Sequence, residues 1–488
     1  MKIFNTLTNT KEDFVPITPG EVKIYACGPT VYNYIHIGNA RPVCVFDTLR
    51  RYLEYRGWKV TYAQNYTDVD DKIINAANEE KISTDEIAQK YIREYQVDAK
   101  GLNILEATYH PKATENVDEI IEIINLLEKK GYAYSAGNGT ETETGTAEEN
   151  EEPSYDVYFE TKKFAEYGKL SHMPLEELES GARIATGELK RNPMDFALWK
   201  AAKPNEPYWE SKWGKGRPGW HIECSAMVRK YLGNTIDIHC GGQDLIFPHH
   251  ENEIAQSEAA WGEPFANYWM HNGYININNK KMSKSEGNFF TVREAANKFG
   301  YEPIRFMLLA AHYRSPINYS NESLSQAKAA LERLYNFKRS IKFSLPNVSD
   351  RCEETDCKLK EFLDGCETAF IESMDDDLNT AGAMAAIFDI VKTINQHLDE
   401  KSQMAISKQT LNHAAEIFDK LNGVLGLLND PENSGDNNLP ADVLDIVEQR
   451  NLARERKDYD TADELRGKIN SMGYTIEETR GGTRVYKS

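Results

Sequence analysis

Residues 21–66 have the sequence EVKIYACGPTVYNYIHIGNARPVCVFDTLRRYLEYRGWKVTYAQNY. Apolar positions 22, 24 and 26 alternate with Lys23 and Tyr25, which predicts a β-strand. A turn-rich segment follows, and apolar residues then recur at helical spacing until Gly57. A second apolar strand begins at Lys59. Strand, glycine-bearing turn, helix and strand form a βαβ unit, so we expect an α/β fold that opens with a Rossmann-like parallel sheet.

Beyond this unit, the predicted secondary structure and the composition change several times along the chain. Residues 117–127 predict an amphipathic helix through Ile120, Ile121 and Ile124. Residues 135–153 carry six Glu and no basic residue, which is typical of a disordered acidic loop. From about Arg314 the strand signals stop and helical periodicity predicts a bundle. We expect four parts: a Rossmann-like domain over 1–315 with a connective insertion at about 110–215, an α-helical bundle over 316–428, a linker over 429–440, and a small C-terminal domain over 441–488.

The net charge of the chain bears on its partners. The 488 residues include 57 Lys and Arg against 77 Asp and Glu, a formal net charge of −20. Because phosphate binding relies on basic side chains, the total argues mildly against a nucleic-acid partner. Between Arg450 and Ser488, however, nine basic residues face seven acidic ones, a local balance of +2. RNA binding needs only a local basic surface, so the total does not exclude it.

Several classes of protein are excluded by composition. The first residues contain no apolar stretch of the kind found in secretory signals. No apolar run approaches the roughly 20 residues of a membrane-spanning helix. The seven cysteines are odd in number and form no dense framework, so we expect reduced thiols or metal ligands. We therefore expect a cytoplasmic protein with no membrane partner.

Two short motifs suggest nucleotide binding. The string HIGN at residues 36–39 stands where the first turn hands over to a helix, a position at which backbone amides attract phosphate. The string KMSKS at residues 281–285 offers two lysines and two hydroxyls on a loop, which can stabilise the charge of a leaving pyrophosphate. Just beyond it, Thr291 and Glu294 predict a helix-capping box. Each motif alone is also compatible with an ordinary turn or a basic surface loop.

HIGN followed by KMSKS resembles the signature pair of the class I aminoacyl-tRNA synthetases. Further strings resemble one family within that class, the cysteinyl-tRNA synthetases: CGPTVY at 27–32, TDVDDK at 67–72, GRPGWHIECSAM at 216–227, FPHHENE at 247–253 and MHNGYI at 270–275. The likeness extends from KIFNTLT at Lys2 to ARERKDYDTADELR near the C-terminus. The resemblance implies that His36, Gly38, Asn39, Lys281, Ser283, Lys284 and Ser285 bind ATP, and that His36, Asn39, Lys281 and Lys284 act in catalysis.

A zinc site can be considered from the residues themselves. Cys27, Cys224, His249 and Glu253 are a plausible ligand set, and His249 and Glu253 are spaced for one helix face. From the residues alone His250 competes equally with His249, and the ligands are dispersed. The resemblance implies the set Cys27, Cys224, His249 and Glu253, with one Zn²⁺ per chain. A thiophilic metal would separate cysteine from serine more strongly than an apolar pocket does.

The resemblance implies ATP-dependent ligation of L-cysteine to tRNA(Cys) through a cysteinyl-adenylate, with Mg²⁺ accompanying ATP. It also implies a monomer whose bundle binds tRNA and whose C-terminal domain recognises the anticodon. One alternative is a cysteine-activating ligase that passes cysteine to an amino-sugar acceptor; such an enzyme should lack the helical bundle. Another is a catalytically idle nucleic-acid-binding paralogue, which the complete KMSKS string disfavours.

Some residues remain open between structural and functional roles. Thr67 and Trp220 occupy strings that line the amino-acid pocket in the family, and His239 and Asp244 flank the GGQD turn. Three further positions, Asp68, Asp70 and Asp71, suggest a helix-start cap more than a magnesium site. The sequence departs from the family pattern at three places: Asn39 replaces the usual His, Cys240 replaces an expected Gly, and Tyr486 stands where Trp is frequent.

Overall fold

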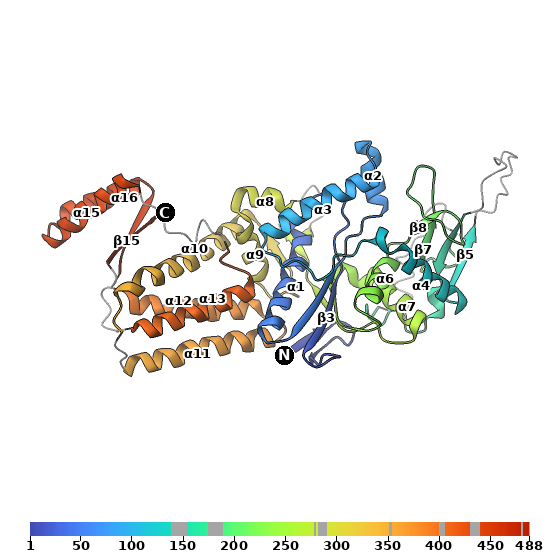
Figure 1. Cartoon of the computed structure of the whole chain (residues 1–488), viewed down its shortest axis with the longest axis horizontal. Helices are drawn as coiled ribbons and strands as arrows, with labels where there is room; N and C mark the ends of the chain where they lie inside the picture. Colours follow the sequence, from blue (N-terminus) through green and yellow to red (C-terminus); the bar gives the residue numbers. More distant parts are fainter. Residues whose placement is uncertain are drawn as a thin grey trace. The chain divides into compact units, whose positions relative to one another are not determined.

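The computed structural model describes residues 1–137, 154–173, 189–277, 280–281, 290–350, 354–399, 406–429, 440–479 and 482–487. They form two compact units (Figure 1). Unit 1 comprises Met1–Asn321 together with Asp375–Leu378, and unit 2 comprises the remainder. Within the described residues, no helix combines the length and apolarity that crossing a membrane requires.

A four-stranded parallel sheet forms the centre of unit 1. Its order is β10-β9-β3-β4, where β3 is Glu21–Ala26, β4 is Lys59–Gln64, β9 is Ile236–Gly242 and β10 is Ala266–Asn272. Helix α1 (Ile37–Tyr55) connects β3 to β4 and packs on one face of the sheet. The chain leaves α1 through Gly57, whose φ of 87° suits a residue without a Cβ. The predicted α/β fold with a Rossmann-like parallel sheet is confirmed.

The two faces of β3 are both buried, which its alternating pattern did not predict. Tyr25, on the face opposite to Val22 and Ile24, is fully buried. It belongs to an apolar cluster with Met227 and Ile254, from the helices α6 (Ile222–Tyr231) and α7 (Glu251–Trp261). Because helices cover both faces, the central strand tolerates apolar side chains on each of them.

An antiparallel sheet is inserted between β4 and β9. Its order is β5-β6-β7-β8, formed by Ala133–Gly137, Tyr155–Phe159, Phe196–Ala201 and Gly216–Pro218. Helix α4 (Val117–Lys129) packs on it through Ile120, Ile123 and Ile124. Ile121, predicted for that face, is only partly buried, and Ile123 takes its place.

The acidic segment begins later than its composition predicts. Residues 135–137 continue β5 and pair with residues 155–157 of β6, so the prediction of a loop from Ser135 is wrong for them. Their strand conformation depends on pairing with β6, about 20 residues further along the chain, and local composition does not detect such pairing. The acidic run at 138–153 lies outside the described residues.

The remaining elements of unit 1 complete the walls around the sheet. Their bounds are β1 Lys2–Asn5, β2 Thr10–Asp13, α2 Asp71–Glu80, α3 Thr84–Gly101, β11 Ile275–Ile277, β12 Lys280–Lys281, α8 Val292–Phe299, α9 Tyr301–Leu309 and β13 Ile317–Tyr319. Strand β13 pairs in parallel with β11. The prediction that strands end at Arg314 is therefore wrong, because three residues are enough for a strand beside an existing partner.

Unit 2 is mostly helical. Four helices, α10 Asn321–Ser344, α11 Glu354–Asp375, α12 Thr380–Leu398 and α13 Lys408–Leu425, bury apolar faces as a bundle. The C-terminal part consists of α15 Ala441–Glu455, α16 Tyr459–Ser471 and the hairpin β14 Tyr474–Thr479 with β15 Gly482–Lys487. Ile446, Ile469 and Ile476 form its small core.

A tetrapeptide returns from this bundle to unit 1. Residues Asp375–Leu378 join α11 to α12 but belong to unit 1 by their contacts. Asp377 is fully buried and accepts hydrogen bonds from the Phe4 amide and the Tyr313 hydroxyl, both at 2.8 Å. Asp375 receives the Arg56 guanidinium at 2.7 Å. No local pattern predicts this excursion, because the partners of Asp377 are more than 60 residues away in the sequence.

Candidate functional site

A cavity of about 360 Å³ opens at the carboxyl ends of the parallel strands. Such an edge is where open α/β sheets bind ligands, because successive loops diverge there. Its walls come from the turn after β3, the start of α1, the residues after β4, and the ends of β9 and β10. The residues that line it are Cys27–Thr30, Tyr32–His36, Gly38, Asn39, Pro42, Val43, Asn65, Thr67, Lys72, Tyr95, Trp220, Cys224, Gly242, Asp244, Leu245, His249 and Asn272–Ile275.

The HIGN residues form the N-terminus of α1. His36 is the N-cap, and its Nδ1 accepts a hydrogen bond from the Asn39 amide at 3.1 Å. In return, the Asn39 side-chain oxygen accepts from the His36 amide at 3.3 Å. A neutral imidazole whose Nδ1 accepts carries its proton on Nε2. His36 thus has a donor without being cationic, and Asn39 keeps the NH₂ of its amide as a donor.

The segment that contains KMSKS is anchored at this cavity from both sides. Lys281 lies on β12, whose residues pair with β11 next to the cavity-lining Ile275. At the other side, the amide of Val292 donates to the carbonyl of Ile35 at 2.9 Å. The predicted capping box of Thr291 and Glu294 is confirmed. Ser283, Lys284 and Ser285 lie outside the described residues, as does the side chain of Lys281.

The four expected metal ligands converge from different elements. Cys27 follows β3, Cys224 is in α6, and His249 lies in the turn Ile246–His250 before α7, which carries Glu253. Next to Cys27, Gly28 approaches the backbone so closely that a Cβ would lie 1.7 Å from the Asn65 carbonyl oxygen. Ligand atoms of Cys27, Cys224, His249 and Glu253 lie within 4.8 Å of one another, so the structure brings this set together.

The distances among these atoms can be compared with a zinc tetrahedron. Zinc bonds of about 2.3 Å to sulfur and 2.0–2.1 Å to nitrogen imply edges of about 3.8 Å between sulfurs and about 3.6 Å from sulfur to nitrogen. The two Sγ atoms of Cys27 and Cys224 are 3.8 Å apart, and Cys224 Sγ is 3.7 Å from His249 Nε2. Glu253 Oε1 lies 3.6 Å from Cys27 Sγ. The donor types fit zinc, and so do these three spacings, whereas His249 Nε2 and Glu253 Oε1 lie 2.8 Å apart, closer than the tetrahedral edge of about 3.3 Å.

Two of the four groups, Cys224 and Glu253, are held toward the anionic form by their neighbours. A hydrogen bond from Cys27, together with the nearby His249, lowers the pKa of Cys224 to about 6, although burial opposes this. Burial raises the pKa of Cys27. Burial alone would raise the pKa of Glu253, but His239 and His249 outweigh it and hold that pKa well below its usual range. A thiolate and a carboxylate in a buried site favour a bound cation.

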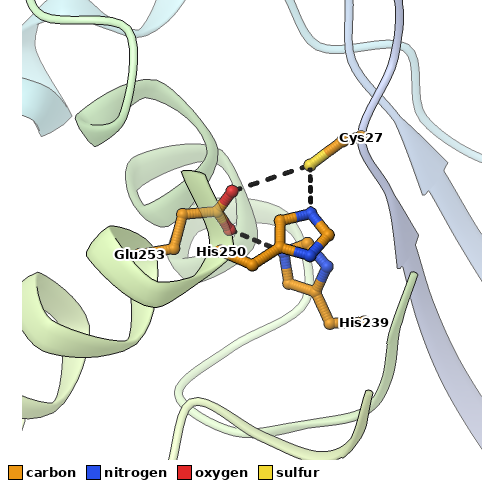
Figure 2. A group of neighbouring side chains, drawn as sticks. All are labelled: Cys27, His239, His250 and Glu253. Atoms are coloured by element: carbon orange, nitrogen blue, oxygen red, sulfur yellow. Dashed lines mark hydrogen bonds and ion pairs between the residues drawn. The ribbon is translucent and has the colours of Figure 1, made fainter. Parts of the chain in front are cut away.

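A second set of four donors overlaps the first (Figure 2). It consists of Cys27, His239, His250 and Glu253. His250 Nε2 lies 3.2 Å from Cys27 Sγ, while its Nδ1 is 2.8 Å from His271 Nε2. His239 Nε2 is 2.6 Å from the Glu253 carboxylate. Unlike His249, neither His239 nor His250 lines the cavity.

Of the residues whose roles the sequence left open, some line the cavity and others do not. Thr67, Trp220 and Asp244 line the cavity, and the Trp220 indole stacks on His249 with ring centroids 4.3 Å apart. Cys240 is buried in β9, where its Sγ lies 3.4 Å from the Tyr25 carbonyl oxygen, and it joins neither donor set. Tyr486 lies on β15, and the structure does not describe its side chain.

The three aspartates of the TDVDDK string have separate structural roles. Asp70 caps α2, as predicted. Asp68 accepts from Thr114, and Asp71 pairs with Lys200 at 2.9 Å. Lys72 of the same string also lines the cavity, although no local sequence pattern marks it as a site residue.

Comparisons with known proteins agree with this geometry. Residues 13–329 match the family described as tRNA synthetases class I (C) catalytic domain, residues 369–429 match the DALR domain, and residues 436–486 match the cysteinyl-tRNA ligase anticodon binding domain. The chain is 54% identical to a cysteine--tRNA ligase of Clostridioides difficile and 51% identical to one of Caldicellulosiruptor saccharolyticus, covering 99% of each protein and of this chain.

Solved structures support the fold independently. A leucyl-tRNA synthetase of Agrobacterium radiobacter, in a ternary complex with tRNA, superposes with a TM-score of 0.61 at 11% identity, covering 88% of this chain and 87% of that one. A methionyl-tRNA synthetase of Mycobacterium tuberculosis superposes with a TM-score of 0.60 at 17% identity, covering 84% and 92%. At such low identities the likeness concerns the fold alone.

Proposed function

The chain belongs to the cysteine--tRNA ligase family of class I aminoacyl-tRNA synthetases, and from this membership we propose how its residues join L-cysteine to tRNA(Cys). The cysteine carboxylate attacks the α-phosphate of ATP, which releases pyrophosphate and leaves cysteinyl-adenylate. The terminal ribose 2′-OH of the tRNA then attacks the adenylate carbonyl. Neither step demands much acid–base chemistry, so positioning and electrostatic stabilisation dominate.

Cys27, Cys224, His249 and Glu253 hold the zinc ion in this proposal. Three of them, all but Glu253, line the cavity, so an ion held there faces the substrate. The chemistry that zinc supplies when bound is affinity for a thiolate, which the harder serine hydroxyl does not match. The four residues fix the site on four separate segments, and the hydrogen bond from His239 orients the Glu253 carboxylate. The single observation that carries the proposal is this thiol pair beside the α1 N-terminus in one cavity.

The ATP phosphates bind at His36, Gly38 and Asn39. His36 donates from Nε2, since its Nδ1 is engaged by the Asn39 amide. Gly38 admits the phosphates close to the backbone, and the Asn39 amide group donates a further hydrogen bond. Lys281, Ser283, Lys284 and Ser285 close over the leaving pyrophosphate; their roles are assigned from the KMSKS motif. Mg²⁺ accompanies the ATP as part of that substrate.

The domains after the catalytic one favour tRNA as the acceptor. Helices α10–α13 provide a bundle for the tRNA, and the part beyond residue 440 resembles an anticodon-binding domain. An enzyme that transfers cysteine to an amino sugar has no use for either part. We place the enzyme in the cytoplasm, because its substrates are ATP, a free amino acid and tRNA. Likeness to the family favours a monomer.

One assay tests the overall reaction. Purified enzyme with ATP, Mg²⁺, radiolabelled cysteine and bulk tRNA should yield acid-precipitable cysteine. Pyrophosphate exchange without charging of tRNA would point to the amino-sugar acceptor. If neither activity were found, the chain would be an idle paralogue.

A second experiment tests the zinc site without relying on activity. Elemental analysis should find about one zinc per chain, and Cys224→Ser should lower that content strongly. Cobalt in the same site should absorb light through its thiolate bonds, and this absorption should weaken in the variant. The matched control is Cys366→Ser, in unit 2, which should leave the metal content unchanged. Equal zinc content in all three proteins would contradict the assignment.

A further inference from the structure

Lys72 is a basic residue of the cavity to which the reaction as described assigns no role. It is the second residue of α2, directly after Asp71. Of the described residues that line the cavity, it is the only lysine or arginine. Its Nζ lies 5.6 Å from the ring centroid of Tyr32, which lines the same cavity. One unit of positive charge therefore stands in the cavity to which the proposed function assigns the phosphates.

Lys72 has no carboxylate partner among the residues that the structure describes. The nearest candidate in sequence, Asp70, uses Oδ1 to accept from the backbone amide of Lys72 at 2.9 Å. Asp71 is engaged by Lys200 at 2.9 Å and by Arg217. Some other lysines of unit 1 are paired, such as Lys90 with Glu80 at 2.8 Å. A lysine left unpaired in a cavity is free to bind an anionic substrate group.

The backbone of Lys72 is held from the inserted sheet. Asp71 binds Lys200 of β7 and Arg217 of β8, and Arg217 also binds Glu206 at 3.2 Å. Arg217 is almost fully buried, whereas the Asp71 carboxylate that it binds is more than half exposed. The Asp70 cap fixes the same turn of α2. Only the side chain of Lys72 must then be ordered when a ligand binds, which keeps the entropic cost of binding low.

We propose that Lys72 binds a phosphate oxygen during the cysteinylation reaction. The inference rests on the proposed function, which supplies two phosphate sources. One is the α-phosphate of ATP, which remains in the adenylate. The other is the last phosphodiester of the tRNA acceptor end, which must reach the same cavity for the 2′-OH to attack. In both cases the ammonium donates to a phosphate oxygen and neutralises its charge, and no covalent bond to Lys72 forms.

The test compares Lys72→Met, Lys72→Arg and Lys81→Met in the full-length, zinc-loaded enzyme. Lys81 is the matched control, because it is an exposed lysine at the other end of α2 and does not line the cavity. Cysteine-dependent ATP–pyrophosphate exchange measures the first step. Single-turnover transfer from preformed cysteinyl-adenylate to tRNA measures the second step. Zinc content and thermal unfolding check that each variant is folded.

We expect Lys72→Met to lower kcat/KM for at least one step by about 10- to 100-fold, with Lys72→Arg recovering part of the loss. Loss of exchange alone identifies the ATP phosphate as the ligand. Loss of transfer alone identifies the tRNA phosphodiester, and loss of both with rescue by Arg identifies the adenylate phosphate. The inference is overturned if Lys72→Met matches Lys81→Met in both steps, or if Arg rescues neither. Failure of wild-type charging would instead overturn the proposed function.

Discussion

The guanidinium of Arg41 donates a hydrogen bond to the carbonyl oxygen of Gly273 at 2.7 Å. Arg41 is fully buried in α1, two residues after Asn39. The same group reaches the carbonyls of Tyr274 at 3.0 Å and His312 at 3.3 Å. Gly273 and Tyr274 line the cavity. One side chain therefore connects the signature helix to the opposite wall of the site.

Arg41→Lys should loosen this wall. A lysine has the charge but not the planar fork, so carbonyls bound by Arg41 lose their donors at about 1–3 kcal/mol each. We expect a fall of several degrees in the midpoint of thermal unfolding and a raised KM for ATP in pyrophosphate exchange. Arg93→Lys, at an exposed position of α3, should change neither quantity. Equal behaviour of both variants would refute the coupling.

Asp377→Ala should destabilise unit 1 although the residue lies between two helices of the bundle. The substitution removes a buried carboxylate and leaves the Phe4 amide, the Tyr313 hydroxyl and Arg314 without their acceptor. Loss of one partner of a buried ionic network costs about 3–5 kcal/mol. Asp377→Asn should cost less, since Asn keeps an acceptor and tolerates the φ of 62°. Urea unfolding at neutral pH measures both, and an unchanged midpoint for Asp377→Ala would exclude the role.

His239→Asn should weaken zinc binding without removing a proposed ligand. His239 is fully buried and holds the Glu253 carboxylate at 2.6 Å. Removing an outer partner of a metal ligand raises the dissociation constant by about 10- to 100-fold. Competition with a chromogenic chelator measures this constant. His413→Asn, on the surface of unit 2, is the control. An unaltered constant for His239→Asn would favour a site that does not use Glu253.

His110 should make stability depend on pH. Burial lowers its pKa, although the hydrogen bond between Nδ1 and the Gln64 carbonyl at 2.9 Å opposes this. The folded pKa lies below the unfolded value of about 6.5. The contribution of the neutral ring is therefore complete above pH 6.5 and is lost as the pH falls through the folded pKa. The free-energy difference between wild type and His110→Gln should shrink between about pH 7.5 and pH 5. A constant difference would show that His110 does not titrate in this range.

Much of the architecture follows from local patterns. The alternation from Val22 to Ala26, the helical spacing up to Gly57 and the caps at Asp70 and Thr291 depend on near neighbours in the chain. These are the features that period and capping chemistry detect. The ligand set of the metal site was predicted differently, from short strings that resemble those of a known family.

What local patterns miss depends on distant partners. Tyr25 is buried because α6 and α7 return to cover its face more than 190 residues later in the sequence. Residues 135–137 became a strand because β6 supplies a ladder. Lys72 lines the cavity because of the way α2 packs, which the string TDVDDK does not reveal. Each outcome is decided by tertiary contacts, which composition and periodicity do not contain.

The excursion of Asp375–Leu378 has a consequence for dissecting the chain. A fragment that ended at Asn321 would contain the whole cavity yet lack the acidic turn that receives Phe4, Tyr313, Arg314 and Arg56. Truncation at Asn321 therefore leaves the Phe4 amide, the Tyr313 hydroxyl and two arginine side chains without their acceptors. A fragment meant to activate cysteine on its own would need residues Asp375–Leu378 joined to the chain after β13. Unit 1 is therefore discontinuous in the sequence, although its residues form one compact body.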